Sequence, residues 1–137
     1  MKLEKKRVLV VGMARSGIAA AELLLRHGAI PVLSDMKTEE HFGDQLNHLH
    51  GTACQFRLGE DSVSLLDEVD VLMISPGVPI DAPVVKAAKE KNIPVIGELE
   101  LAYSLLMGDM VALSGTNGKT TTTTLLGKIF QNAGRIT

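Results

Sequence analysis

The sequence predicts an α/β fold, with a parallel sheet followed by the start of a second, phosphate-binding domain. Short runs of β-branched and aliphatic residues alternate with longer helical stretches along the chain. This alternation is typical of parallel strands that are joined by crossover helices. Two glycine-rich turns, at residues 12–17 and 115–118, each follow a strand-like run and precede a helical one. Turns of this kind commonly bind nucleotide phosphates.

The expected strands are short, apolar and rich in β-branched residues, as buried parallel strands are. They are residues 7–11, 30–34, 53–57, 69–74, 94–96 and 110–113. The first five complete a doubly wound sheet. The sixth begins something new, because a single strand leaves both of its edges unpaired. We therefore expect a Rossmann-like domain at residues 1–97 and the incomplete start of a P-loop ATPase domain at 98–137.

Helical periodicity and end signals predict the elements between the strands. The expected helices are residues 17–27, 38–50, 81–91, 98–106 and about 120–133. Gly28 is a natural C-cap for the first helix. Asp81 is the expected N-cap of the third, with Pro83 in its first turn.

Composition excludes several classes of function. The 137 residues carry a net charge of −2 and aromatic residues at only 3%, which disfavours nucleic-acid binding. Cys54 is the single cysteine, so neither an internal disulfide nor a zinc cluster is expected. We expect Cys54 to be a buried, small apolar residue. The charged N-terminus and the short apolar runs indicate a cytoplasmic protein without membrane insertion. The four histidines lack ligand spacing and are expected on the surface.

The first glycine turn resembles the dinucleotide-binding fingerprint G-x-G-x-x-G. It reads Gly12-Met13-Ala14-Arg15-Ser16-Gly17. Ala14 stands in place of the middle glycine, where a methyl group crowds a pyrophosphate. The turn should lie at the carboxyl end of the first strand, where open α/β sheets bind their ligands.

Two further segments should meet this turn at the same edge of the sheet. Asp35 follows the second strand, where an acidic residue bonds a ribose, and residues 75–77 (Ser-Pro-Gly) follow the fourth. Together they predict a site for a nucleotide diphosphate. Each also has a plainer interpretation: Gly12 and Gly17 allow close packing, Asp35 is a solvated loop residue, and Ser-Pro-Gly is a common turn.

The second glycine turn predicts a site for a nucleoside triphosphate. Its residues are Gly115, Thr116, Asn117, Gly118, Lys119, Thr120 and Thr121. Backbone N–H groups of such a loop, and the helix that follows, attract phosphate. Lys119 would reach the β- and γ-phosphates, and the Thr120 hydroxyl would bind Mg²⁺. Leu113 occupies the place of the usual first glycine. The alternative is a simple turn with an exposed lysine.

Four motifs, in this order, resemble those of the Mur ligases: residues 12–17, 74–79, 96–101 and 115–121. Within that family they are most similar to the members that add D-glutamate to UDP-N-acetylmuramoyl-L-alanine. The resemblance implies an ATP- and Mg²⁺-dependent amide ligase of peptidoglycan synthesis, which acts through an acyl phosphate. It also implies that the first domain holds the UDP part of the substrate.

The resemblance carries over to individual positions. It assigns Lys119 and Thr120 to catalysis, with Mg²⁺ on Thr120 and ATP on residues 115–121. It assigns the UDP part to Gly12, Ala14, Arg15, Ser16, Asp35, Met36, Lys37, Ser75, Pro76 and Gly77. The family's other catalytic parts would lie after residue 137, so this chain alone is expected to be inactive.

Two alternatives remain open at this point. The first glycine turn by itself fits an NAD-binding Rossmann domain of a regulatory protein or an oxidoreductase. The whole chain fits a non-catalytic nucleotide-binding module. The part after residue 98 is expected either to self-associate or to be disordered, because its apolar residues lack the rest of a sheet.

Overall fold

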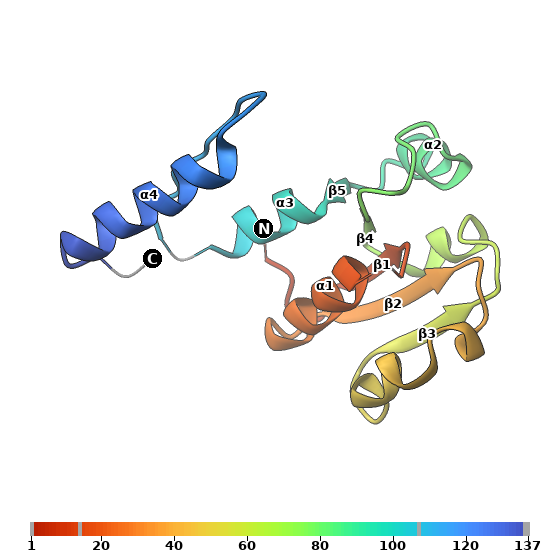
Figure 1. Ribbon diagram of the computed structural model, residues 1–137. Helices are drawn as coiled ribbons and strands as arrows, with labels where there is room; N and C mark the ends of the chain where they lie inside the picture. The colour runs from red at the N-terminus through yellow and green to blue at the C-terminus, as the bar shows by residue number, and fades with distance from the viewer. Residues whose placement is uncertain (1, 14, 107, 136–137) are drawn as a thin grey trace. The chain divides into compact units, whose positions relative to one another are not determined.

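The computed structural model describes residues 2–13, 15–106 and 108–135, apart from the side chain of Arg15. The chain forms two compact units, Met1–Leu106 and Met107–Thr137, and each is described by itself (Figure 1). None of the helices in the described ranges combines the length and the apolar character that crossing a membrane requires.

A parallel sheet forms the centre of the first unit. In the described part of the chain it has five strands in the order β3-β2-β1-β4-β5. They are β1 (Arg7–Val11), β2 (Ile30–Asp35), β3 (Gln55–Leu58), β4 (Val71–Ile74) and β5 (Val95–Gly97). The predicted α/β fold with a parallel sheet is thus confirmed. The third strand begins later than expected, because the Thr52 Oγ1 accepts the Cys54 N–H at 3.1 Å in a preceding turn.

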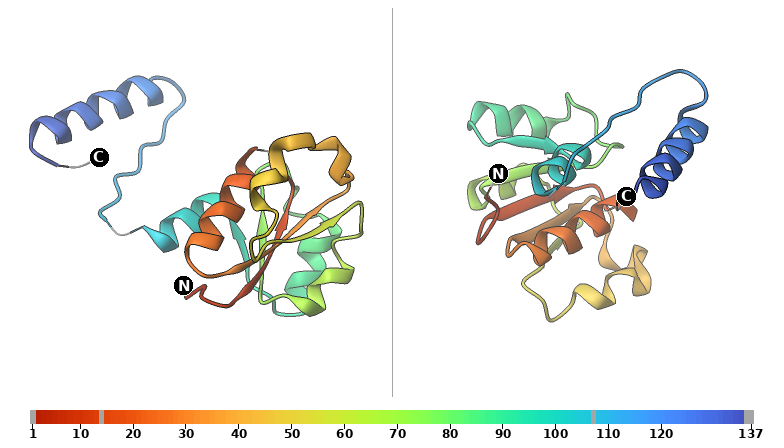
Figure 2. Two further views of the ribbon diagram at one scale, coloured as in Figure 1. Left: turned by 90° about the horizontal axis from the view of Figure 1, so that it is seen from below. Right: turned by 90° about the vertical axis from the view of Figure 1, so that its left-hand side faces the viewer.

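Helices cover both faces of this sheet (Figure 2). They are α1 (Arg15–Arg26), α2 (Pro83–Glu90), α3 (Glu98–Leu105) and the 3-10 helices η1 (Glu39–His41), η2 (Gly43–Leu49) and η3 (Ser64–Glu68). Within β1, Val8 and Val10 pack with α1, η2 and α3 on one face, while Leu9 packs with η3 and α2 on the other. All three side chains are completely buried, which explains the unbroken apolar run.

Two expected helices differ from the structure. The helix expected at residues 38–50 is not one regular helix: the segment forms η1 and η2, which Phe42 separates. Gly43, the first residue of η2, has φ 51°, which interrupts a regular helix. Asp81 is not the N-cap of α2. Ala82 takes that place, because its N–H closes a turn onto the Pro79 carbonyl at 3.0 Å, and Pro83 then begins the helix as expected.

The first unit runs to Leu106, beyond the boundary expected at residue 97, because Leu101 of α3 is buried in its core. The second unit contains α4 (Lys119–Asn132), where a helix was expected. Residues 110–113 form no strand, contrary to expectation. A strand needs a hydrogen-bonded neighbour, and the described part of this unit offers only a helix.

Candidate nucleotide-binding site

The backbone alone requires the two outer glycines of the first turn. Gly12 has φ 92°, a conformation that other residues rarely adopt. At Gly17, an added Cβ would lie 2.2 Å from the carbonyl oxygen of Gly12. These glycines let α1 begin directly against the end of β1, as the packing interpretation predicted. The N-terminus of α1, with its outward N–H groups, therefore lies at the carboxyl edge of the sheet.

Ser75 ties the end of β4 to this turn. Its side chain is buried, and its Oγ donates a hydrogen bond to the Gly12 carbonyl at 2.8 Å. Its backbone N–H donates to Val11 at 3.1 Å. The serine of the Ser-Pro-Gly segment thus fixes the glycine turn in place, and Pro76 and Gly77 remain exposed beside it.

Asp35 connects the same turn to the end of β2. Its Oδ2 accepts the Met13 N–H at 2.8 Å, and its Oδ1 accepts the Lys37 N–H at 3.0 Å. The side chain is partly buried, whereas Met36 and Lys37 are exposed. The plainer interpretation of Asp35 as a solvated loop residue is therefore wrong.

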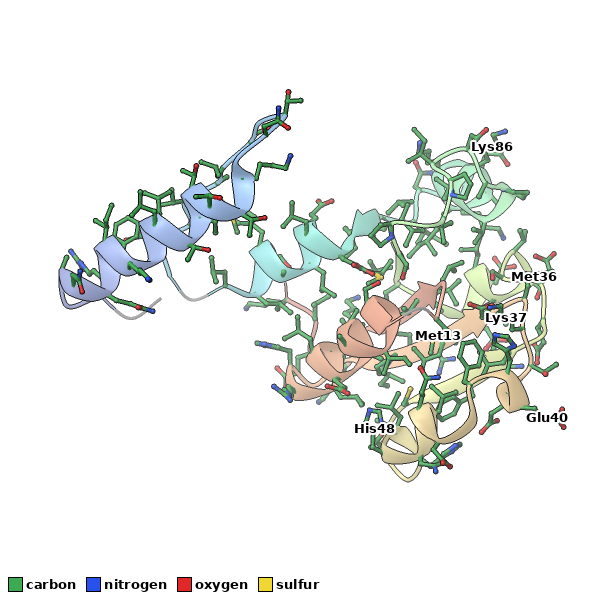
Figure 3. The ribbon with its side chains drawn as sticks, viewed as in Figure 1. Met13, Met36, Lys37, Glu40, His48 and Lys86 are labelled. Atoms are coloured by element: carbon green, nitrogen blue, oxygen red, sulfur yellow. The ribbon has the colours of Figure 1, made fainter. Side chains whose placement is uncertain are left out.

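These segments enclose a cavity of about 570 Å³. It is lined by Gly12, Met13, Ser16, Asp35, Lys37, His41, Phe42, Gln45, Ser75, Pro76, Gly77 and Val78. Seven of the ten residues expected at the UDP part line it. Figure 3 shows Met13, Met36 and Lys37 at the same end of the sheet. Ala14 and the side chain of Arg15 lie outside the described residues.

A second cavity of about 470 Å³ adjoins the first. The two share Gly12, Asp35, Gly77 and Val78 in their walls. Met36, the remaining described residue of the predicted set, lines the second cavity together with mostly apolar neighbours. The polar members of its wall include Asp61 and Ser62.

One wall of the first cavity was not predicted from the sequence. His41, Phe42 and Gln45 come from η1, η2 and the residue between them. Phe42 is buried, and the His41 ring meets it edge-on with ring centroids 5.6 Å apart. His41 is exposed as expected, but its place beside the cavity depends on how residues 38–50 fold. No spacing signal in the sequence indicates that place.

In the second unit, the predicted phosphate loop lies directly before α4. Gly118 has φ 75°, and the helix begins at Lys119. The Lys119 ammonium donates hydrogen bonds to the carbonyls of Gly115 at 2.5 Å and Thr116 at 3.3 Å. Thr120 lies in the first turn of α4, and its carbonyl accepts the Thr124 hydroxyl at 2.9 Å. Residues 115–121 are exposed. The Lys119 side chain therefore folds back over the loop that precedes it.

Comparison with known proteins identifies the family. Residues 6–97 match the family described as Mur ligase MurD-like, N-terminal domain. The chain belongs to this family. The resemblance inferred from the four motifs is thereby confirmed.

The Mur ligase relatives match along the whole chain. One is the UDP-N-acetylmuramoylalanine--D-glutamate ligase of Alkaliphilus oremlandii, 43% identical over 139 residues, which cover 100% of this chain and 31% of that protein. The chain spans about a third of the length of the curated relatives it matches.

Solved structures support the fold. The UDP-N-acetylmuramate:L-alanyl-gamma-D-glutamyl-meso-diaminopimelate ligase from Neisseria meningitides aligns with a TM-score of 0.60 and 23% identity, over 94% of this chain and 40% of that one. Shikimate dehydrogenase from Aquifex aeolicus also aligns, with a TM-score of 0.54 and 16% identity, over 81% of this chain and 52% of that one. The fold by itself therefore does not distinguish a ligase from a dehydrogenase.

Proposed function

We propose that the protein containing this chain is an ATP-dependent amide ligase that joins D-glutamate to UDP-N-acetylmuramoyl-L-alanine in peptidoglycan synthesis. The first unit binds the UDP part of that substrate. The observation that carries this proposal is the cavity at the carboxyl edge of the sheet, lined by seven residues of the expected set. The names of relatives that match along almost the whole chain, all D-glutamate ligases, support the choice of substrates.

The cavity offers suitable chemistry for a nucleotide diphosphate. The N-terminus of α1 supplies N–H groups and a partial positive charge, and the Ser16 hydroxyl is a further donor in the cavity wall. Ala14 and Arg15 belong to the same turn and complete the proposed diphosphate contacts. The Lys37 ammonium adds a cation in the wall.

The base and the ribose would lie on the β2 side of this site, near Asp35 and Met36. Ser75, Pro76 and Gly77 form the opposite wall. The buried Phe42 adds apolar surface to the cavity.

The second unit begins an ATP-binding domain, in which residues 115–121 contact the phosphates. The loop suits an anion, because an ammonium group and the N-terminus of a 14-residue helix meet there. On binding, Lys119 would turn from the two loop carbonyls to the β- and γ-phosphates and offset negative charge on the phosphoryl group in transfer. The Thr120 hydroxyl would hold Mg²⁺, which supplies further charge compensation.

The proposed reaction makes an acyl phosphate from the alanyl carboxylate, and the D-glutamate amine then displaces phosphate. The 137 residues span about a third of the length of the relatives that are named as D-glutamate ligases. We therefore expect the chain to bind UDP without catalysing ligation.

The test is a ligation assay on the complete protein with ATP, Mg²⁺, UDP-N-acetylmuramoyl-L-alanine and D-glutamate, in which phosphate release and product mass are measured. Lys119→Ala should reduce turnover roughly 10²–10³-fold while the melting temperature stays nearly constant, because the side chain stabilises charge and not the core. Lys128→Ala, an exposed lysine of α4, is the matched control and should keep normal turnover. Failure of the unaltered protein to form the amide product would contradict the proposal.

A further inference from the structure

Asp35 lies in the wall that the two cavities share, at the carboxyl end of β2. Each of its carboxylate oxygens accepts a backbone hydrogen bond from a different loop. Oδ2 is 2.8 Å from the Met13 nitrogen, and Oδ1 is 3.0 Å from the Lys37 nitrogen. One side chain therefore joins the glycine turn after β1 to the loop after β2.

We propose that Asp35 is a positioning residue, which holds these two loops in place and so fixes the wall of the nucleotide cavity. It acts on the nucleotide through the loops and not by bonding the ribose. The inference rests on the proposed function, since it concerns the site in which UDP is expected.

The glycine turn is held from two sides. On the β4 side, the Ser75 Oγ donates to the Gly12 carbonyl at 2.8 Å. On the β2 side, the Asp35 carboxylate accepts the N–H of the next residue, Met13. Hydrogen bonds to an ionised carboxylate are stronger than neutral ones, so the Asp35 contact contributes strongly to holding the turn. A turn that is already ordered costs less to bind than one that the ligand must order.

The bond to Lys37 has a second consequence. It holds the backbone of residues 35–37, from which Met36 and Lys37 extend into the walls of the second and the first cavity. Loss of the carboxylate would therefore loosen both cavities together. All parts of the nucleotide would then bind less tightly, whichever hydroxyls the ribose carries.

A ribose contact makes a different prediction, and the two can be separated. An ionised carboxylate has about four acceptor positions, so the two backbone bonds alone do not prevent a further bond to a hydroxyl. If Asp35 bonds a ribose hydroxyl, the unaltered chain binds the analogue without that hydroxyl less tightly than it binds UDP. The Asp35→Asn variant would then bind UDP and that analogue equally tightly.

The experiment measures the affinity of the 137-residue chain for UDP, 2′-deoxy-UDP and 3′-deoxy-UDP by titration calorimetry. Asp35→Asn removes the charge and one acceptor. Asp44→Asn is the matched control, because it removes the same charge from an exposed position in η2 that lines neither cavity. Asp35→Glu keeps the charge but displaces it, and replaces Asp35→Asn if that variant does not fold.

We expect Asp35→Asn to weaken binding of all three nucleotides by the same factor, roughly tenfold, while Asp44→Asn leaves each affinity unchanged. Amide hydrogen exchange at Met13 and Lys37 should become faster in Asp35→Asn only. This second measurement needs no ligand.

Two results would overturn the inference. The first is that the unaltered chain binds UDP more tightly than a deoxy analogue and the Asp35→Asn variant does not. The other is unchanged exchange at Met13 and Lys37. Absence of UDP binding to the unaltered chain would instead contradict the proposed function, and the exchange rates would still decide whether Asp35 holds the loops.

Discussion

Replacing Gly17 by alanine should damage both the fold and the nucleotide cavity. The new Cβ would lie 2.2 Å from the Gly12 carbonyl oxygen, and ordinary contact begins at 3.4 Å, so the two must separate by about 1.2 Å. That oxygen belongs to the backbone and cannot rotate away. It also accepts the hydrogen bond from the buried Ser75 hydroxyl at 2.8 Å. The shift therefore strains the turn and removes a partner from Ser75.

The two effects have known sizes. Forcing an extra methyl group into a packed site costs roughly 1–3 kcal/mol. A buried hydroxyl left without its partner costs roughly another 1–3 kcal/mol. We therefore expect Gly17→Ala to lower the free energy of unfolding by about 2–6 kcal/mol in urea titrations followed by circular dichroism.

Gly77→Ala is the matched control, because Gly77 lines the same cavity but an added Cβ there meets no atom of the described residues within 4 Å. It should unfold like the unaltered chain. If Gly17→Ala also had unchanged stability, the close approach of α1 to β1, and the explanation of this glycine by packing, would be wrong.

Three further predictions concern charge, the thiol and the second unit. Lys6 and the Arg7 backbone N–H each donate to Asp70 at 2.8 Å and hold the pKa of this carboxyl below its ordinary value of 3.8. Asp70→Asn should therefore lower the free energy of unfolding by roughly 0.2–1 kcal/mol at neutral pH, as the loss of an exposed ion pair does. The difference in stability between the two chains should shrink as the pH falls below 3.8, where the unaltered side chain also becomes protonated. A difference that stayed constant down to about pH 2 would contradict the contact. Burial raises the pKa of the Cys54 thiol from 9.0 to about 11. Alkylation of this thiol at pH 8 should therefore be about a hundredfold slower than alkylation of a free cysteine, and it should accelerate in urea. Equal alkylation rates with and without urea would show an accessible thiolate. The 137-residue chain should bind ATP weakly. It should also either self-associate through exposed residues such as Val111, Leu125 and Ile129 or exchange the amides of its second unit rapidly. A monomer by light scattering, together with a second unit protected from hydrogen exchange and a micromolar affinity for ATP, would refute this.

The sequence predicted the sheet because local patterns determine it. The run Val8-Leu9-Val10 is apolar without a break, as a strand covered on both faces must be, and Gly28, with φ 72°, ends α1 where the C-cap signal indicated. The predicted site residues meet because parallel strands end at one edge, which chain order and the parallel pattern already imply.

Features that depend on tertiary context were not predictable in the same way. Residues 38–50 have helical composition, but Gly43 and the fit of Phe42, Leu46 and Leu49 into the core select 3-10 helices, and only these place His41 and Gln45 at the cavity. The sequence suggested a ribose contact for Asp35 from its position alone. Its bond to the Lys37 amide is local to the loop after β2, but its bond to the Met13 amide depends on the pairing of β1 with β2, which brings the two loops together.

The most direct test of the account is a calorimetric comparison of UDP and NAD binding to the 137-residue chain. We expect UDP to bind more tightly, because the proposed function assigns the UDP part of the substrate to the cavity beside Gly12, Ser16 and Asp35, and Ala14 would crowd a dinucleotide pyrophosphate. NAD binding as tight as UDP binding, or tighter, would contradict it and favour a dinucleotide-binding domain.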